Sequence, residues 1–187
     1  MGAKIQIVNV RRKEKTNYRK RLRVLLARKP RIVIRKSLKH VYVQVVRNMA
    51  EGDQVLFTMS SKNLQKLGWK AGQKNLPSAY LTGLMAGKKA KAMGINDAIL
   101  DLGLNRAVKG AKIFAALKGV VDGGVRVPHS DSILPGEDRI SGKHIVQHAS
   151  NIKGTRVDFK AYAKNNVKPE DLPKLFDEMK NKIMRMQ

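Results

Sequence analysis

The chain contains no cysteine, few aromatic residues and no long apolar run. Among its 187 residues, Phe, Trp and Tyr together make up 5%. The lack of cysteine excludes disulfides and Cys-ligated zinc. No stretch of about eighteen apolar residues occurs, so we expect no membrane-spanning helix. No apolar run follows the first basic residues, so we also expect no secretory signal.

Acidic residues are scarcest in the first forty residues, where fifteen Lys and Arg accompany a single carboxylate, Glu14. The whole chain has 39 Lys and Arg against 14 Asp and Glu, a formal net charge of +25. A block so rich in one charge repels itself unless a polyanion neutralises it. Arginine binds phosphate oxygens with two parallel donors. The block therefore indicates a nucleic-acid backbone as partner, and a lipid surface is disfavoured because the sole tryptophan, Trp69, lies outside it.

The length and the 42% hydrophobic content predict one domain with a real core and an appendage. We expect a basic N-terminal arm over residues 1–15 and an RNA-binding α/β domain over 16–128. Residues 129–187 are expected to form a largely helical C-terminal extension, with helices starting near Ser141 and after Pro169.

The basic block predicts a helix that starts at Thr16 or Asn17 and ends before Pro30. Its apolar residues fall on one face at helical spacing, and they are Tyr18, Leu22, Leu25 and Leu26. The arginines spread over the remainder of the helix.

After this helix, alternating apolar residues and short links predict an antiparallel three-strand meander over residues 31–37, 41–46 and 55–60. A helix over 77–94 with small residues at Ala79, Gly83, Gly87 and Ala90 is expected to approach the sheet closely. A buried strand over 95–102, a helix capped by Asn105 and a last strand over 125–127 complete the pattern. The predicted fold is α/β, with a mixed five-stranded sheet of ribonuclease-H-like topology.

The candidate site is a basic surface made by the arm, the first helix, the turn at 35–40 and two polar loops. Arginine and lysine there suit phosphates, and Ser37 and His40 suit phosphate or 2′-hydroxyl contacts. The predicted RNA-binding residues are Arg11, Arg12, Lys13, Asn17, Tyr18, Arg19, Arg21, Arg23, Arg35, Lys36, Ser37, Lys39, His40, Lys62, Lys70 and Lys74. Trp69, between the two loops, is interpreted as a packing residue.

The ribonuclease-H-like pattern raises the alternative of a metal-dependent nuclease, which needs clustered carboxylates. The first predicted strand and the helix over 77–94 carry none, and Asp97 and Asp101 have no partner that the sequence identifies. His144 and His148 have the spacing of a zinc protease but lack its adjacent Glu. We therefore expect no catalytic residue, metal or cofactor, while a DNA-binding protein remains open.

Six segments, taken together and in order, carry a family resemblance. They are TNYRKRLR (16–23), RKSLKH (35–40), GWK (68–70), AYLTG (79–83), FAALKG (114–119) and ILP (133–135). The chain resembles the large-subunit ribosomal proteins of family eighteen, the 5S-rRNA-binding family, in its archaeal form. It departs from the pattern at Lys112, where we expect arginine.

The resemblance implies a structural protein without catalytic activity, located in the cytoplasm within the ribosome. It implies binding to 5S rRNA and attachment of that RNA to 23S rRNA in the central protuberance. The implied partners are these two RNAs and neighbouring ribosomal proteins, without a membrane and without a homo-oligomer.

Overall fold

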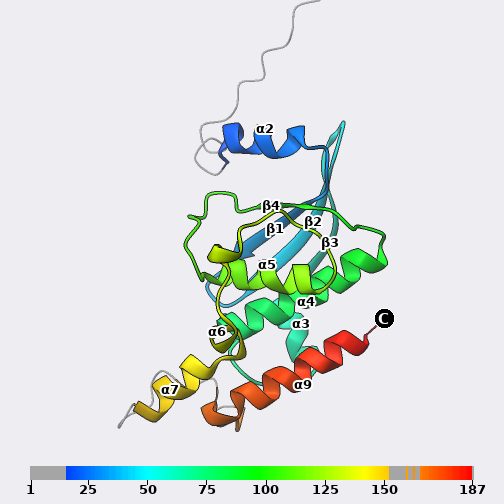
Figure 1. Cartoon of the computed structure of the whole chain (residues 1–187). Coiled ribbons are helices and arrows are strands. Elements are labelled where there is room, and N and C mark those ends of the chain that lie inside the picture. Colours follow the sequence, from blue (N-terminus) through cyan, green and yellow to red (C-terminus); the bar gives the residue numbers. More distant parts are fainter. Residues whose placement is uncertain (1–15, 152–158, 160–161, 163–164, 187) are drawn as a thin grey trace, which may run out of the picture.

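The computed structural model describes residues 16–151, 159, 162 and 165–186. The strands are β1 (Arg31–Lys36), β2 (Val41–Met49), β3 (Gly52–Ser60) and β4 (Ile99–Asp101). The helices are α2 (Tyr18–Leu26), α3 (Ser61–Lys66), α4 (Leu76–Ala92), α5 (Lys112–Asp122), α6 (Glu137–Ser141), α7 (Lys143–Asn151) and α9 (Leu172–Arg185), with 3-10 turns η1 (Asp131–Ile133) and η3 (Pro169–Asp171). Helices α4 and α5 cover one face of the sheet, and α2 lies beyond the other (Figure 1).

The sheet has the strand order β3-β2-β1-β4, with antiparallel pairs β3–β2 and β2–β1 and a parallel pair β1–β4. The predicted meander and the mixed character are confirmed. The predicted fifth strand is wrong, because residues 125–127 contribute only one isolated bridge, between Asp97 and Arg126. Pro128 follows at once and lacks the N–H that a longer ladder requires. The ribonuclease-H-like topology is therefore not confirmed.

Two of the small residues of α4, Gly83 and Gly87, face helix α5 rather than the sheet, which corrects the prediction at these positions. A Cβ on Gly83 would lie 2.0 Å from the carbonyl oxygen of Ala116, and one on Gly119 would lie 2.1 Å from that of Tyr80. Both glycines therefore allow α4 and α5 to pack backbone against backbone. Helix α4 also contributes larger residues to the core, such as Leu81 and Leu84, which are fully buried.

Two predicted element boundaries are also wrong. Helix α5 begins at Lys112 rather than at Asn105, whose side-chain amide instead donates to the carbonyl of Leu102 at 2.9 Å. The predicted strand over 95–102 shortens to the three residues of β4. The helix expected to start near Ser141 corresponds to α7, which starts at Lys143, and Gly142, with a φ of 88°, separates it from the short helix α6.

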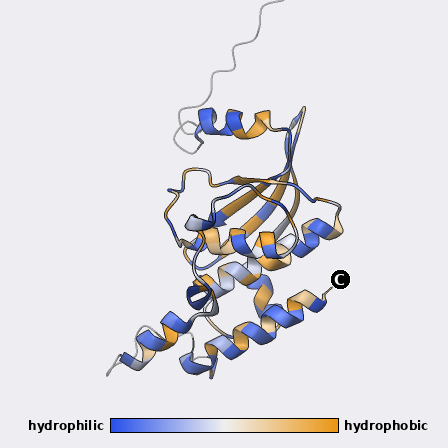
Figure 2. Ribbon diagram, in the orientation of Figure 1, coloured by the Kyte–Doolittle hydropathy of each residue, from blue (hydrophilic) through white to orange (hydrophobic). Residues whose placement is uncertain are grey.

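The C-terminal helix α9 packs on α4 and shares its core. Its buried residues are Leu172, Phe176, Met179 and Ile183, and the ring of Phe176 lies 5.5 Å from that of Tyr80 on α4. Figure 2 shows apolar colour along the strands of the sheet and an alternation of polar and apolar residues along α9. Whether residues 129–187 form a separate extension stays a prediction.

Candidate nucleic-acid interface

Helix α2 exposes most of its apolar residues, while Val24 and Leu25 are half-buried. Asn17 caps the helix as predicted, since its side-chain oxygen accepts from the backbone N–H of Lys20 at 3.0 Å. None of the helix residues is buried, and Tyr18, Leu22 and Leu26 are 42%, 62% and 71% exposed. In Figure 2 the apolar colour of α2 lies in its C-terminal half. The predicted apolar face therefore exists, but the core does not use it.

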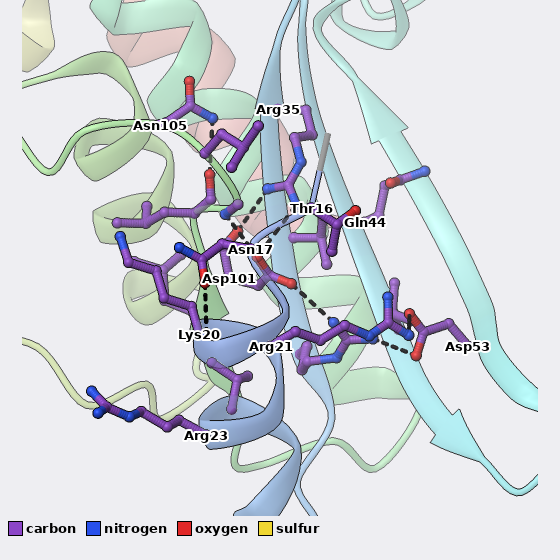
Figure 3. A pocket seen from close by; sticks show the side chains of 18 of the residues that line it. Thr16, Asn17, Lys20, Arg21, Arg23, Arg35, Gln44, Asp53, Asp101 and Asn105 are labelled. Carbon is purple, nitrogen blue, oxygen red and sulfur yellow. Dashed lines mark hydrogen bonds and ion pairs between the residues drawn. The ribbon is translucent and has the colours of Figure 1, made fainter. Parts of the chain in front are cut away.

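The polar side of α2 faces the sheet across a groove of about 600 Å³ (Figure 3). One ion pair crosses this groove, from Arg21 on α2 to Asp53 on β3 at 2.8 Å. Three more continue it along the sheet: Asp53 to Arg31 at 2.5 Å, Arg31 to Asp101 at 2.9 Å, and Asp101 to Arg35 at 3.3 Å. We call these five residues the ion-pair ladder. Arg31, at its centre, is only 3% exposed. The ladder joins α2 to the sheet through the Arg21–Asp53 pair, and the groove is also lined by apolar residues, Val24 on α2 and Val33, Val46 and Val55 on the sheet.

The register of the sheet assembles this ladder. Arg31 and Arg35 are four residues apart on β1, so their side chains leave the sheet on the same face. On the neighbouring strand β4, Asp101 is the register partner of Val33, which lies midway between the two arginines. Its carboxylate pairs with both of them. The expectation that Asp101 has no partner is therefore wrong. The two-residue alternation of β1 is the signal that could have placed Arg31 and Arg35 together.

The three arginines predicted on α2 divide into two groups. Arg19 and Arg23 are exposed and form no ion pair with any described residue. Arg21 contacts Asp53, so a carboxylate from outside the basic block offsets the charge of the helix at this position. Sequence reasoning missed Asp53 because it lies on β3, thirty-two positions further along the chain.

The turn between β1 and β2 is closed by its own polar groups. The N–H of Ser37 donates to the carbonyl of His40 at 2.8 Å, and the N–H of His40 donates to the hydroxyl of Ser37 at 3.0 Å. The His40 ring nitrogen Nδ1 lies 3.3 Å from the hydroxyl of Ser61. Ser37 therefore shapes the turn, and Lys39 at its tip is left exposed.

A second basic region is a hollow of about 1110 Å³ beside this turn. Four predicted residues line it: Lys39, His40, Lys62 and Lys74. Three residues outside the predicted site also line it: Lys112, Arg139 and His144. None of the described residues around it is acidic. We call it the cationic hollow. Lys112 begins a helix, which is the signal that could have drawn attention to it.

The remaining predicted residues lie elsewhere. Lys36 is exposed at the end of β1, and Lys70 borders a smaller hollow beneath α9. Trp69 is 2% exposed and donates its indole N–H to the carbonyl of Gly72 at 3.2 Å, so it is a packing residue as predicted. Arg11, Arg12 and Lys13 fall outside the described residues.

The described part of the chain contains no group of three or more His, Asp or Glu placed to hold a metal ion. None of its helices has the length and apolar character needed to cross a bilayer. Fold and site together define a basic α/β protein whose cations gather in a groove beneath α2 and in the cationic hollow.

Comparison with known proteins identifies the family. The model of the ribosomal large subunit proteins 60S L5 and 50S L18 matches residues 4–98 and 88–130. The large ribosomal subunit protein uL18 of Methanothermobacter thermautotrophicus is 45% identical over 175 residues, which cover 92% of this chain and 91% of that protein. The uL18 of Methanococcus maripaludis is 44% identical over 191 aligned positions, covering 100% of this chain and 99% of that protein. The chain belongs to this family of ribosomal large subunit proteins, in its archaeal uL18 form. The family is structural, so the chain is not an enzyme.

Proposed function

We propose that this protein binds 5S rRNA and helps to attach it to 23S rRNA in the central protuberance of the large subunit. The observation that carries the proposal is helix α2, where Arg19 and Arg23 are exposed without an ion-pair partner among the described residues. Such side chains can neutralise RNA phosphates, whereas the paired Arg21 is already largely satisfied.

The ion-pair ladder gives α2 a defined position for this contact. An apolar interface would hold the helix by burying Leu22 and Leu26, but these residues are exposed. Arg21 instead fixes the helix to Asp53, and Asp53 is fixed to the buried Arg31. A contact surface held in place before binding loses less entropy when the RNA arrives. The exposed ring of Tyr18, next to Arg19, is available to stack on an unpaired base.

The test is filter binding of the full chain to a 5S rRNA transcript over a salt series. The variant Arg19→Gln/Arg23→Gln removes two cations of α2 that have no ion-pair partner among the described residues. The matched control, Lys66→Gln/Lys174→Gln, removes two exposed lysines that line neither basic region. We expect the variant to bind about 100-fold more weakly, because each charge-assisted contact contributes about 1.5 kcal/mol. Equal affinity of variant and control would contradict the proposed role of α2.

Competition separates 5S rRNA from other polyanions. We expect unlabelled 5S rRNA to displace the labelled transcript at much lower concentration than duplex DNA of the same length. Sequence-independent phosphate contacts are common to both, but α2 must also fit a particular RNA shape. Equal competition by duplex DNA would favour the alternative of a DNA-binding protein.

A further inference from the structure

We propose that the cationic hollow is a second RNA contact, separate from α2, that holds consecutive backbone phosphates of a ribosomal RNA strand. The inference rests on the proposed RNA-binding function, but not on which ribosomal RNA is bound. It assigns a role to Lys112, Arg139 and His144, which sequence reasoning did not include in the site.

Five structural elements converge on the hollow. Lys39 and His40 come from the β1–β2 turn, Lys62 from α3, Lys74 from the segment before α4, Lys112 from α5 and Arg139 from α6. These residues span a hundred positions of the chain, so the fold brings them together. Charge brought together from five elements is costly unless an anion offsets it.

The hollow differs from an ordinary solvated basic surface because its charges influence one another. Partial burial lowers the pKa of the Lys112 side chain, and the nearby cations of Lys74 and Lys36 lower it further. Burial, followed by the charge of Arg139, lowers the pKa of the His144 ring. Both groups therefore lie in a field that disfavours another positive charge and favours a bound anion.

Backbone donors add to this field. Helix α5 is eleven residues long, and its N-cap residue, Ala111, provides no side-chain hydrogen bond. The first amides of a helix have no partner within the helix, and the positive end of its dipole attracts anions. Helix α4 differs, because the side chain of Asn75 accepts from the N–H of Ser78 at 2.9 Å. The uncapped end of α5 lies at Lys112, within the lining of the hollow.

Size and openness indicate a polymer rather than a small ligand. Pockets for small molecules measure roughly 300 to 1,000 Å³ and are mostly apolar, whereas this hollow measures about 1110 Å³ and is lined largely by polar side chains. One phosphate group cannot contact cations contributed by five elements. A backbone with successive phosphates can, and the amino groups of Lys74 and Lys112 suit such contacts as mobile point charges.

Two variants with the same charge test the assignment. Lys74→Gln/Lys112→Gln removes two cations from the hollow, and Lys66→Gln/Lys174→Gln removes two from elsewhere on the surface. In the first arm, melting temperatures are compared in phosphate and in chloride at equal ionic strength, without RNA. In the second arm, the slope of log affinity against log salt is measured with the 5S rRNA transcript. Acetylation of Lys112, followed by mass spectrometry with and without the transcript, reports on the hollow itself.

We expect the RNA to protect Lys112 from acetylation and the hollow variant to reduce the salt slope by about 2, since each phosphate contact contributes about 1. The control is expected to keep the slope of the unchanged chain. An unchanged slope in the hollow variant, or unprotected Lys112 in the complex, overturns the proposal. Stabilisation by inorganic phosphate with no effect of the variant on RNA binding also overturns it, because the hollow would then hold a free oxyanion.

The two proposals fail in different ways. If 5S rRNA is not the ligand, the unchanged chain binds the transcript no better than unrelated RNA, and the proposed function fails. The second arm is then repeated with a 23S rRNA fragment, where the same slope change is expected from the hollow. Loss of the slope change with both RNAs, while α2 variants still weaken binding, overturns the hollow alone.

Discussion

The groove beneath α2 and the cationic hollow are both rich in Lys and Arg, but only the groove contains carboxylates. In the groove, Asp53 and Asp101 contact three arginines at 2.5 to 3.3 Å. The described lining of the hollow has seven basic or histidine side chains and no acid. The two carboxylates of the groove therefore offset part of its charge, and the pair of Asp53 with Arg21 serves to hold α2. The hollow is left with a charge that an external anion must offset.

The largest expected effect on stability comes from removing a carboxylate from the ion-pair ladder. Asp101→Asn leaves Arg31 and Arg35 with one carboxylate fewer, and Arg31 is 3% exposed. We expect a loss of about 2 to 3 kcal/mol in the free energy of unfolding, measured in urea, because a buried arginine loses a partner. Asp97→Asn is the control, since the Asp97 side chain is 45% exposed and its carboxylate lies 3.9 Å from Nε of Arg126. Equal stability of the two variants would show that the ladder does not support the fold.

The second prediction tests whether Asp53 affects RNA binding by positioning α2 or only through its charge. Asp53→Asn makes the groove more positive, so Coulomb attraction alone would raise the affinity for RNA. If Asp53 instead positions α2 through Arg21, affinity for 5S rRNA falls, by roughly fivefold or about 1 kcal/mol. Filter binding at one salt concentration gives the sign directly. A rise in affinity would mean that α2 needs no fixed position.

Removing a charge from the hollow is expected to have the opposite effect on stability to removing one from the ladder. Lys112→Gln removes a cation that Lys74 and Lys36 repel. We expect the free protein to keep its stability or to gain up to about 0.5 kcal/mol at low salt, a small figure because solvent screens these groups. Thermal melting at low and at high salt checks this, since salt should abolish any gain. A clear loss of stability would indicate that Lys112 has a structural partner.

The smallest effect is expected on the outer face of α2. Leu22 is 62% exposed, so Leu22→Ala should change the free energy of unfolding by less than about 0.5 kcal/mol. Leu81→Ala, at a fully buried position of α4, should cost about 2 to 5 kcal/mol. Denaturant unfolding of both variants measures the contrast. A large loss at Leu22 would mean that apolar packing, rather than the ladder, holds α2.

The elements that were predicted correctly depend on residues that lie close together in the sequence. The cap at Asn17, the meander and the helix after Pro169 follow from side-chain patterns within short segments. The elements that were wrong depend on distant contacts. Gly83 packs on α5 and not on the sheet, and residues 125–127 do not extend the sheet beyond one bridge.

The candidate site shows the same division. Exposed Arg19 and Arg23 were found from charge density, because such density needs no knowledge of the fold. The ladder was not found, because its central pair, Arg31 and Asp101, is separated by 70 positions. The hollow was found in part, since Lys39, Lys62 and Lys74 belong to basic segments. Lys112 and Arg139 join them only after α5 and α6 have packed.

The most direct test of two RNA contacts on one protein is the salt dependence of 5S rRNA binding in a variant series. The series contains the unchanged chain, Arg19→Gln/Arg23→Gln, Lys74→Gln/Lys112→Gln and the combination of all four substitutions. Each pair should lower the slope of log affinity against log salt by about 2, and the combination by about 4, as expected for independent phosphate contacts. A combined variant whose slope equals that of either pair alone would contradict the account.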